Sequence, residues 1–505
     1  MSEATNSMDN NKVVALRPEE LKEQEKKGII YQISICLLVC FVVLGPSMGF
    51  GYSAIAIPPL TSLKTDDLRL TLSQANWFAT ASALGIPFGC VVSSFVMSRG
   101  RKLSLLAISG ISLIGWLTIH FTSNYEQILA GRVISGVATG MASVPATVYI
   151  AEVSGPKWRS TMVTWTSVSI AVGILLVYVF GYFIQENWRT VALICSLFPV
   201  VSIVLTLTLI PESPMWLREK GRVDEAITVL KRFRGVPKDQ LASPGLLQEL
   251  QSRHQNRKKQ NLWRHLTKRT SLVPFGITLS YFLFQQFSGI FVVIYYAVNI
   301  TQEAGLKMDA YMGAVLIGLT RLFGSLLVAF VSRKFGRRLP TVVSGAGMTF
   351  FMGALALYLY MIELGYEFND GGVIPVICVL MYIFVSTLGF LVLPFAMVGE
   401  LFPAKVKDVL SGTTTCIAYI FSSITVKTYP DMLALMGKHG VFLFYALVSL
   451  VGTIFLGIFL PETKGKTLDE IQDLFSKKKK TRNGFVEVLV DDGKIMPMKT
   501  CSVET

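Results

Sequence analysis

The sequence is poor in charged side chains and in histidine. Only 16% of its 505 residues are Asp, Glu, Lys or Arg, against about a quarter in soluble proteins. Its four histidines and seven scattered cysteines show no metal-ligand spacing. No glycine-rich loop that could cradle a phosphate precedes a strand-like segment, so neither catalysis nor nucleotide-driven transport is expected. The sequence predicts no cofactor, no metal and no enzymatic activity.

Long apolar runs dominate the chain instead. Hydrophobic residues make up 52% of the sequence, and the mean hydropathy is +0.53. Runs of about 20 residues, each long enough to cross a bilayer, recur along the whole length. We therefore predict an all-α membrane protein with twelve transmembrane helices. They cover roughly residues 30–58, 77–97, 103–121, 128–151, 162–183, 191–210, 272–300, 310–331, 339–361, 373–398, 409–429 and 440–460.

Basic residues concentrate on alternate connections between these runs. Residues 211–270 carry fourteen Lys and Arg, whereas the opposite set of loops carries few. By the positive-inside rule, both termini and this central segment are predicted to be cytoplasmic. Residues 1–27 are polar and show no cleavable signal peptide, and we expect them to be disordered. The plasma membrane is the default location, and the net charge of +14 indicates topology rather than nucleic-acid binding.

Three sequence markers occur twice at nearly one period. Gly100 and Gly336 sit in matching basic loops, Glu152 and Glu400 each end a run, and Pro-Glu-Ser at 211–213 returns as Pro-Glu-Thr at 461–463. Two six-helix repeats are therefore predicted, with a substrate site between them near the midplane. The domains are a tail (1–28), a first half (29–210), a linker with short helices (211–270), a second half (271–460) and a C-terminal tail (461–505).

Two adjacent glutamines, Gln285 and Gln286, lie inside the apolar run 272–300. Hydrocarbon offers an amide no partner, so each amide needs another helix, water or a polar ligand. The residues alone leave two interpretations open, hydrogen bonding between helices or a ligand site. Neighbours on a helix point about 100° apart, so the two amides need not share one role.

Several motifs together resemble the sugar porters of the major facilitator superfamily, and within them insect facilitated trehalose transporter-like proteins. The resemblance covers about residues 28–475. It is carried by GRVISGVATG (131–140), PESPMWL (211–217), QQFSGI (285–290) with Tyr295-Tyr296, RKFGRR (333–338), GELFP (399–403) and PETKGKTLDEI (461–471).

This resemblance implies a facilitative transporter that works by alternating access on a sugar or polyol, with trehalose and hexoses as candidate cargo. We expect a monomer in the bilayer that binds no nucleic acid. Gln285 and Gln286 match the paired sugar-binding amides of the family, and Tyr295 and Tyr296 match its outer aromatic pair. Other family amides and the span-ten tryptophan are replaced, which predicts a more aromatic cavity; the replacements are Ser167, Tyr178, Phe291, Arg321, Phe395 and Ala418-Tyr419.

The resemblance also implies a charged network on the cytoplasmic side that locks the outward-open state. Met97 and Arg333 stand where the family often has an acid or an asparagine, so one latch partner is missing in each half. The alternative is that these basic residues only mark the cytoplasmic side of the membrane, with their charges placed at its surface. The predicted network comprises Arg101, Glu152, Arg159, Arg337, Arg338, Glu400 and Lys407.

Three further expectations concern coupling and cargo. No Asp or Glu lies in the interior of any run, so we predict uniport rather than proton coupling. Arg321 lies midway along the eighth run, where it either binds an anionic or polyhydroxyl ligand or pairs with backbone carbonyls. Asn299 heads a glycosylation sequon very near the membrane. A non-transporting sugar sensor and a porter of a non-sugar metabolite remain alternatives.

Overall fold

The structure is a computed structural model. It describes residues 18–62, 68–155, 157–237, 265–303, 309–366, 368, 371–403, 406–464 and 468–475. All regular secondary structure within these residues is helical.

Ten helical stretches of the described residues are long and apolar enough to cross a membrane. Their exposed surface is rich in Leu, Val, Ile and Phe, as expected for side chains that face lipid. They are formed by α1 (Pro18–Thr61), α2 (Leu72–Arg99), α3 (Arg101–His120), α4 (Tyr125–Ala142) with α5 (Pro145–Val153), α6 (Arg159–Phe183), α7 (Trp188–Thr208), α15 (Ala310–Phe335), α16 (Arg338–Glu363), α17 (Val373–Leu388) with α18 (Leu393–Leu401), and α19 (Lys407–Phe459).

Three further expected spans look different in the structure, besides the two that are divided between α4 and α5 and between α17 and α18. The run 272–300 is not one helix but α12 (Arg269–Phe287), α13 (Ile290–Tyr295) and α14 (Ala297–Glu303). The runs 409–429 and 440–460 are joined without a loop in α19, which contains one non-helical residue, Gly437, at φ 69°. Glycine adopts this left-handed conformation without a Cβ penalty, so the chain turns there within a continuous hydrogen-bonded segment.

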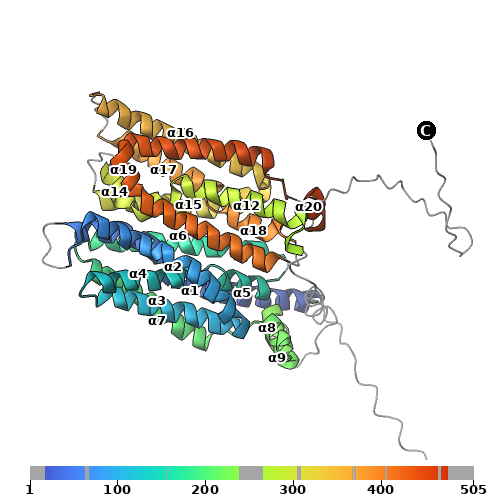
Figure 1. Cartoon of the computed structure of the whole chain (residues 1–505). Coiled ribbons are helices and arrows are strands. Elements are labelled where there is room, and N and C mark those ends of the chain that lie inside the picture. Colours follow the sequence, from blue (N-terminus) through green and yellow to red (C-terminus); the bar gives the residue numbers. More distant parts are fainter. Residues whose placement is uncertain are drawn as a thin grey trace, which may run out of the picture.

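The helices form two groups (Figure 1). The first helical group, α1–α7, occupies the lower part of the view, and the second helical group, α12–α19, the upper part. They pack against each other mainly where α6 meets α15 and α2 meets α19. Three short helices lie at one end of the bundle, the linker end: α8 (Pro214–Glu219), α9 (Val223–Arg234) and α20 (Leu468–Phe475).

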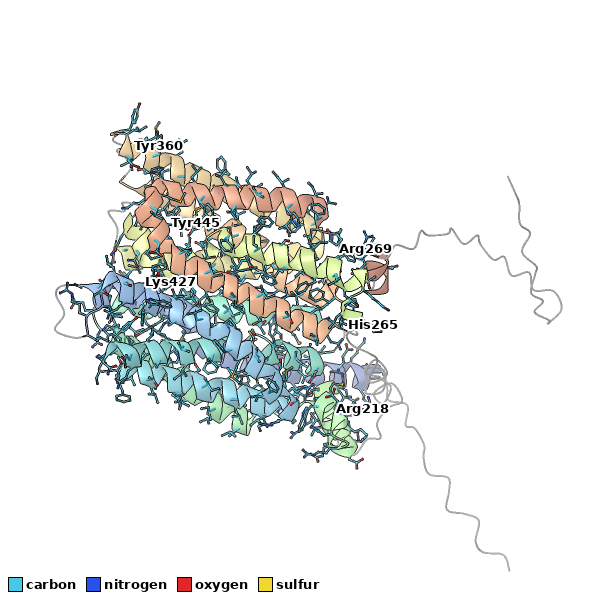
Figure 2. The ribbon with its side chains drawn as sticks, in the orientation of Figure 1. Arg218, His265, Arg269, Tyr360, Lys427 and Tyr445 are labelled. Carbon is cyan, nitrogen blue, oxygen red and sulfur yellow. The ribbon has the colours of Figure 1, made fainter. Side chains whose placement is uncertain are left out.

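Figure 2 identifies the two ends by their side chains. Arg218, His265 and Arg269 lie at the linker end, and Tyr360 lies at the opposite end, called here the far end. The short helices α8 and α9 follow local signals in the sequence. The hydroxyl of Ser213 accepts hydrogen bonds from the N–H groups of the first turn of α8, and Gly235, at φ 70°, ends α9.

The expectation of a disordered tail over residues 1–27 is wrong for its last part, because α1 begins at Pro18. Acidic residues in the first turn favour that helix start, and α9 packs against this part of α1. Gln32 joins two elements: its Nε2 donates to the carbonyl of Phe233 (2.7 Å) and its Oε1 accepts from the N–H of Gly155 (2.8 Å). Tertiary contacts therefore extend the helix beyond its apolar run.

Candidate functional site

The predicted site begins at the break between α12 and α13. Gly289 has φ 87°, and a Cβ there would meet the ring of Tyr445 at 2.5 Å, so only glycine fits. Breaking a membrane helix frees carbonyls that need new donors. The hydroxyl of Ser288 donates to the carbonyl of Gln285 (2.7 Å), and Tyr382 Oη donates to the carbonyl of Ser288 (2.7 Å).

Gln285 serves a second broken helix. The interruption between α17 and α18 leaves the carbonyls of Phe390 and Leu391 free, and the Nε2 of Gln285 donates to both at 2.8 Å. The side chain is fully buried. Of the two interpretations left open by the sequence, hydrogen bonding between helices therefore describes Gln285.

Gln286 differs from its neighbour. It is also fully buried, yet its amide makes only a long contact from Nε2 to the Oε1 of Gln285 (3.4 Å). Its own Oε1 has no hydrogen-bond partner among the described residues. A buried amide oxygen without a donor costs about 1–3 kcal/mol, so this atom is where a polar ligand would contribute most.

An aromatic wall lies next to these glutamines in the chain. Phe291 and Tyr295 on α13 are buried against Phe50 of α1, with ring centroids 5.9 and 6.1 Å apart. Phe50 belongs to the first helical group, so this wall spans both groups. The hydroxyl of Tyr295 lies near Ser82 of α2. Rings of this kind suit the apolar face of a sugar.

The remaining substrate candidates are spread over both groups. Arg321, on α15, is buried, with 7% of its surface exposed. Ser167, on α6, is half-buried. Phe395, on α18, is 36% exposed; its ring packs edge-on against Phe282 at 5.0 Å and lies 6.3 Å from the ring of Tyr419.

At the far end, hydrogen bonds connect the two groups. Tyr178 Oη on α6 donates to the carbonyl of Ile294 at 2.6 Å. Asn76 Nδ2 on α2 donates to the carbonyl of Lys427 (3.0 Å), and Tyr296 Oη donates to Asn76 Oδ1 (3.5 Å). Further along this end, Gln185 and Tyr311 add contacts between α6 and the start of α15. Tyr178 and Tyr296 thus close this end of the structure.

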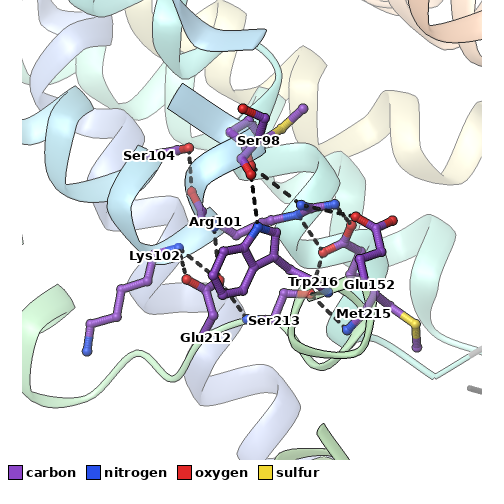
Figure 3. Close-up of polar contacts among 12 residues, drawn as sticks. Ser98, Arg101, Lys102, Ser104, Glu152, Glu212, Ser213, Met215 and Trp216 are labelled. Carbon is purple, nitrogen blue, oxygen red and sulfur yellow. Dashed lines mark hydrogen bonds and ion pairs between the residues drawn. The ribbon is translucent and has the colours of Figure 1, made fainter. Parts of the chain in front are cut away.

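At the linker end of the first group, Arg101 pairs with Glu152 (Figure 3). Arg101 Nη2 and Nε donate to the two carboxylate oxygens at 2.8 and 3.2 Å, and the hydroxyl of Ser213 donates to the same carboxylate. Both charges are largely buried, with side chains 8% and 14% exposed. Arg159 is not part of an ion pair among the described residues and donates instead to the carbonyl of Ser154 (3.4 Å).

The second group repeats this arrangement. Arg337 donates to Glu400 through Nη2 (2.7 Å) and Nε (3.2 Å), and Thr463 takes the place of Ser213 with a 2.7 Å hydrogen bond. Arg338 donates to the carbonyl of Gly457, and Lys407 begins α19. Each ion pair lies within its own helical group. Both pairs are formed in this structure, in which the far end is closed, so the two pairs alone do not hold the far end open.

Sequence reasoning missed two carboxylates that act as helix caps. Glu212 accepts the N–H groups of Arg101 (2.9 Å) and Lys102 (3.1 Å) at the start of α3, and Glu462 accepts those of Arg337 (3.0 Å) and Arg338 (3.1 Å) at the start of α16. A carboxylate is favourable at a helix N-terminus. The signal that could have revealed these caps was present, since the Pro-Glu motifs recur 250 residues apart (462 − 212) and the capped loops 236 residues apart (336 − 100), which is nearly one period.

Burial raises the pKa of the Glu462 carboxyl, but the backbone N–H groups that it accepts outweigh burial. Its pKa therefore lies below the ordinary value. The carboxylate is thus ionised under all ordinary conditions and remains available as a cap.

Asn299 lies on α14, half-buried, and its Oδ1 is buried without a hydrogen-bond partner among the described residues. Within the described residues there is also no group of three His, Cys, Asp or Glu side chains that could hold a metal ion.

Long apolar helices with interruptions, a buried amide oxygen without a described partner beside one of them, and contacts that close one end are typical of a multi-pass membrane transport protein. The chain belongs to the family described as sugar (and other) transporter, whose pattern matches residues 31–475. Its relatives are transporters, so it is not an enzyme.

Two relatives and one solved structure illustrate the similarity. The facilitated trehalose transporter Tret1 of Polypedilum vanderplanki is 31% identical, over 86% of this chain and 87% of that protein. The facilitated trehalose transporter Tret1-2 homolog of Drosophila sechellia is 30% identical, over 87% of this chain and 88% of that protein. The inward open structure of the xylose transporter XylE from E. coli matches with a TM-score of 0.73 at 21% identity, covering 88% of this chain and all of that one.

Proposed function

We propose that this protein is a facilitative porter that carries a sugar across the membrane by alternating access. The observation that carries the proposal is the buried, unpartnered Oε1 of Gln286 beside a broken helix. Sugar hydroxyls both donate and accept, so they can satisfy such an amide. Relatives named as trehalose transporters make trehalose and hexoses the first candidates.

The proposed architecture has twelve spans in two halves. It counts α19 twice, on either side of Gly437, and α12 with α13 and α14 as one interrupted span. The halves cover residues 29–210 and 271–460, with the linker 211–270 and both termini in the cytoplasm of a plasma-membrane protein. The basic residues of the linker support this orientation.

Within this scheme, the structure corresponds to a state closed to the outside. The hydrogen bonds of Tyr178 and Asn76 across the far end support this assignment. Tyr178→Phe removes one bond between the halves, worth about 1 kcal/mol, and should shift the population about fivefold toward outward-open. Distances between spin labels across the far end measure that shift; an unchanged distribution contradicts the assignment.

We further propose uniport. Arg132, on α4, is fully buried, and neutral groups surround it: it donates to the carbonyl of Gly49 (3.1 Å), to the hydroxyl of Ser53 and to the carbonyl of Phe78 (3.4 Å). A proton-coupled site needs a titratable acid in the pathway, and these partners do not titrate in the physiological range.

The decisive experiment is flux into liposomes that hold the purified full chain. Labelled trehalose and glucose are offered at two pH values, with and without an imposed proton gradient. Saturable uptake that the gradient does not accelerate is expected. Sugar binding without flux would favour the sensor, and flux only of an unrelated metabolite would favour the non-sugar porter.

A further inference from the structure

Arg321 is a buried cation with an open hydrogen-bonding position. It lies near the middle of α15, with 7% of its surface exposed. Its Nη1 is buried and has no hydrogen-bond partner among the described residues. The structure records no ion pair for it with a described carboxylate. A guanidinium at membrane depth is expensive unless a counter-charge or carbonyls surround it.

A second buried arginine shows how this fold neutralises such a charge. Arg132 donates from all three of its nitrogens to carbonyls and to a hydroxyl, and its guanidinium lies over the ring of Phe78 at 5.0 Å. The chain therefore can satisfy an arginine without an acid. That Arg321 keeps an unpartnered nitrogen suggests that its partner arrives from outside the chain.

The surroundings of Arg321 come from both helical groups. Tyr178 on α6 packs against α15 one turn before Arg321, where a Cβ at Gly318 would meet its ring at 3.1 Å. Arg321 also lies near Tyr419 on α19, and Tyr295 on α13 lies near both of these tyrosines. These four residues form the arginine–tyrosine cluster. Tyr295 is fully buried and packs edge-on against Phe50 of α1, so it touches the first helical group as well. Arg321 therefore lies where the first and second helical groups meet, which is where a transported ligand would contact both groups as they move.

We propose that Arg321 selects sugars that carry one carboxylate over their neutral counterparts. This inference rests on the proposed function, because it specifies the cargo of that same site. A guanidinium matches the planar geometry of a carboxylate and forms strong charge-assisted hydrogen bonds with it. In this arrangement, Gln286 and the aromatic wall of Phe50, Phe291 and Tyr295 contact the polyhydroxyl ring.

The available charge favours a carboxylate over a phosphate ester. A phosphate monoester carries a charge of about −1.5 to −2 near neutral pH. Arg321 offers a single charge, and the nitrogens of the nearby Arg132 are already occupied by two carbonyls and a hydroxyl. One carboxylate neutralises the charge of Arg321 when the site closes. A uniporter of such a cargo moves one net negative charge per cycle, so its flux responds to membrane voltage, whereas the flux of a neutral sugar does not.

The test uses the purified full chain in liposomes, with counterflow of labelled glucose and three unlabelled competitors that share one ring: glucose, glucuronate and glucose 6-phosphate. In the wild type, glucuronate should compete at about tenfold lower concentration than glucose. Labelled glucuronate uptake should accelerate under an inside-positive potassium diffusion potential, and labelled glucose uptake should not change.

Arg321→Asn should abolish the preference for glucuronate and its voltage response. Arg321→Lys keeps the charge but loses the planar fork, so it should retain part of the preference. Thr320→Val is the matched control: its hydroxyl bonds only to the carbonyl of Leu316 in its own helix, and its competition profile should equal the wild type.

Equal competition by glucose and glucuronate in the wild type, unchanged by Arg321→Asn, would overturn the inference while leaving sugar transport intact. Glucose 6-phosphate as the strongest competitor would overturn the choice of a carboxylate. A complete lack of flux of glucose, trehalose and glucuronate would instead refute the proposed function. Arg321→Asn protein that elutes as a monodisperse peak and still exchanges glucose excludes misfolding as the cause of a lost preference.

Discussion

The two adjacent glutamines should respond in opposite ways when each is replaced by leucine. Gln285→Leu removes two 2.8 Å hydrogen bonds and leaves the carbonyls of Phe390 and Leu391 without a donor in a dry interior. Two unsatisfied carbonyls at about 1–3 kcal/mol each give an expected loss of about 3 kcal/mol. Gln286→Leu removes one long contact and an oxygen that already lacks a partner. We expect it to be neutral or to stabilise the protein by about 1 kcal/mol.

Transport should follow the reverse order for the surviving protein. Gln286→Leu removes the amide that we assign to the sugar, so its affinity for sugar should fall about tenfold or more. The assay combines the apparent unfolding temperature of the purified protein, read from tryptophan fluorescence, with counterflow in liposomes. Equal destabilisation by both substitutions would refute the division of roles. So would full transport by a well-folded Gln286→Leu protein.

Three further predictions concern stability. Glu152→Gln should lower the free energy of unfolding by about 3 kcal/mol and Glu400→Gln by about 1 kcal/mol, because the first acid is 14% exposed and the second 31%. Chemical unfolding in detergent measures both losses, and equal losses would contradict the prediction. The pKa of Glu462 is lowered, so the stability that its carboxylate contributes is present above the ordinary pKa of 4.5 and is lost as the pH falls below 4.5. In Glu462→Gln, the slope of unfolding temperature against pH should therefore flatten in this acidic range. An unchanged slope would reject the capping role. Gly136→Ala should destabilise the protein by about 2 kcal/mol or more, since its Cβ would meet a backbone oxygen of α2 at 2.0 Å. Gly110→Ala should not destabilise it, because nothing lies within 4 Å of the added Cβ. The unfolding temperatures of the two variants test this difference.

Much of the architecture followed from local properties of the chain. Apolar length located the membrane helices, because hydrocarbon permits only segments that satisfy their own backbone. The recurrence of Gly100 and Glu152 at Gly336 and Glu400 anticipated matching loops, and the structure gives each loop an arginine paired with the acid of its own group. The short helices expected in the linker are present as α8 and α9, and the local signals at Ser213 and Gly235 explain where α8 begins and α9 ends.

The helix breaks could not be read from hydropathy. The run 272–300 is apolar along most of its length, yet its helix breaks at Gly289, where the ring of Tyr445, distant in sequence, leaves no room for a side chain. Likewise, α1 extends back to Pro18 because α9 packs on it. Such features depend on which helices pack against each other, and the hydrophobic periodicity of a single sequence does not indicate which helices those are.

The sequence by itself determined that this is a membrane transporter of helical repeats, because composition, run length and family motifs are properties of the chain. It placed Gln285, Gln286 and Arg321 at membrane depth, where each needs a partner. Only the tertiary structure decided which of them finds one inside the protein. Gln285 meets the carbonyls freed by the break between α17 and α18, while Gln286 and Arg321 each keep a buried polar atom without a partner among the described residues. Whether a buried polar side chain finds a hydrogen-bond partner depends on the distance between helices that are remote in sequence, and that distance is set only when the chain folds.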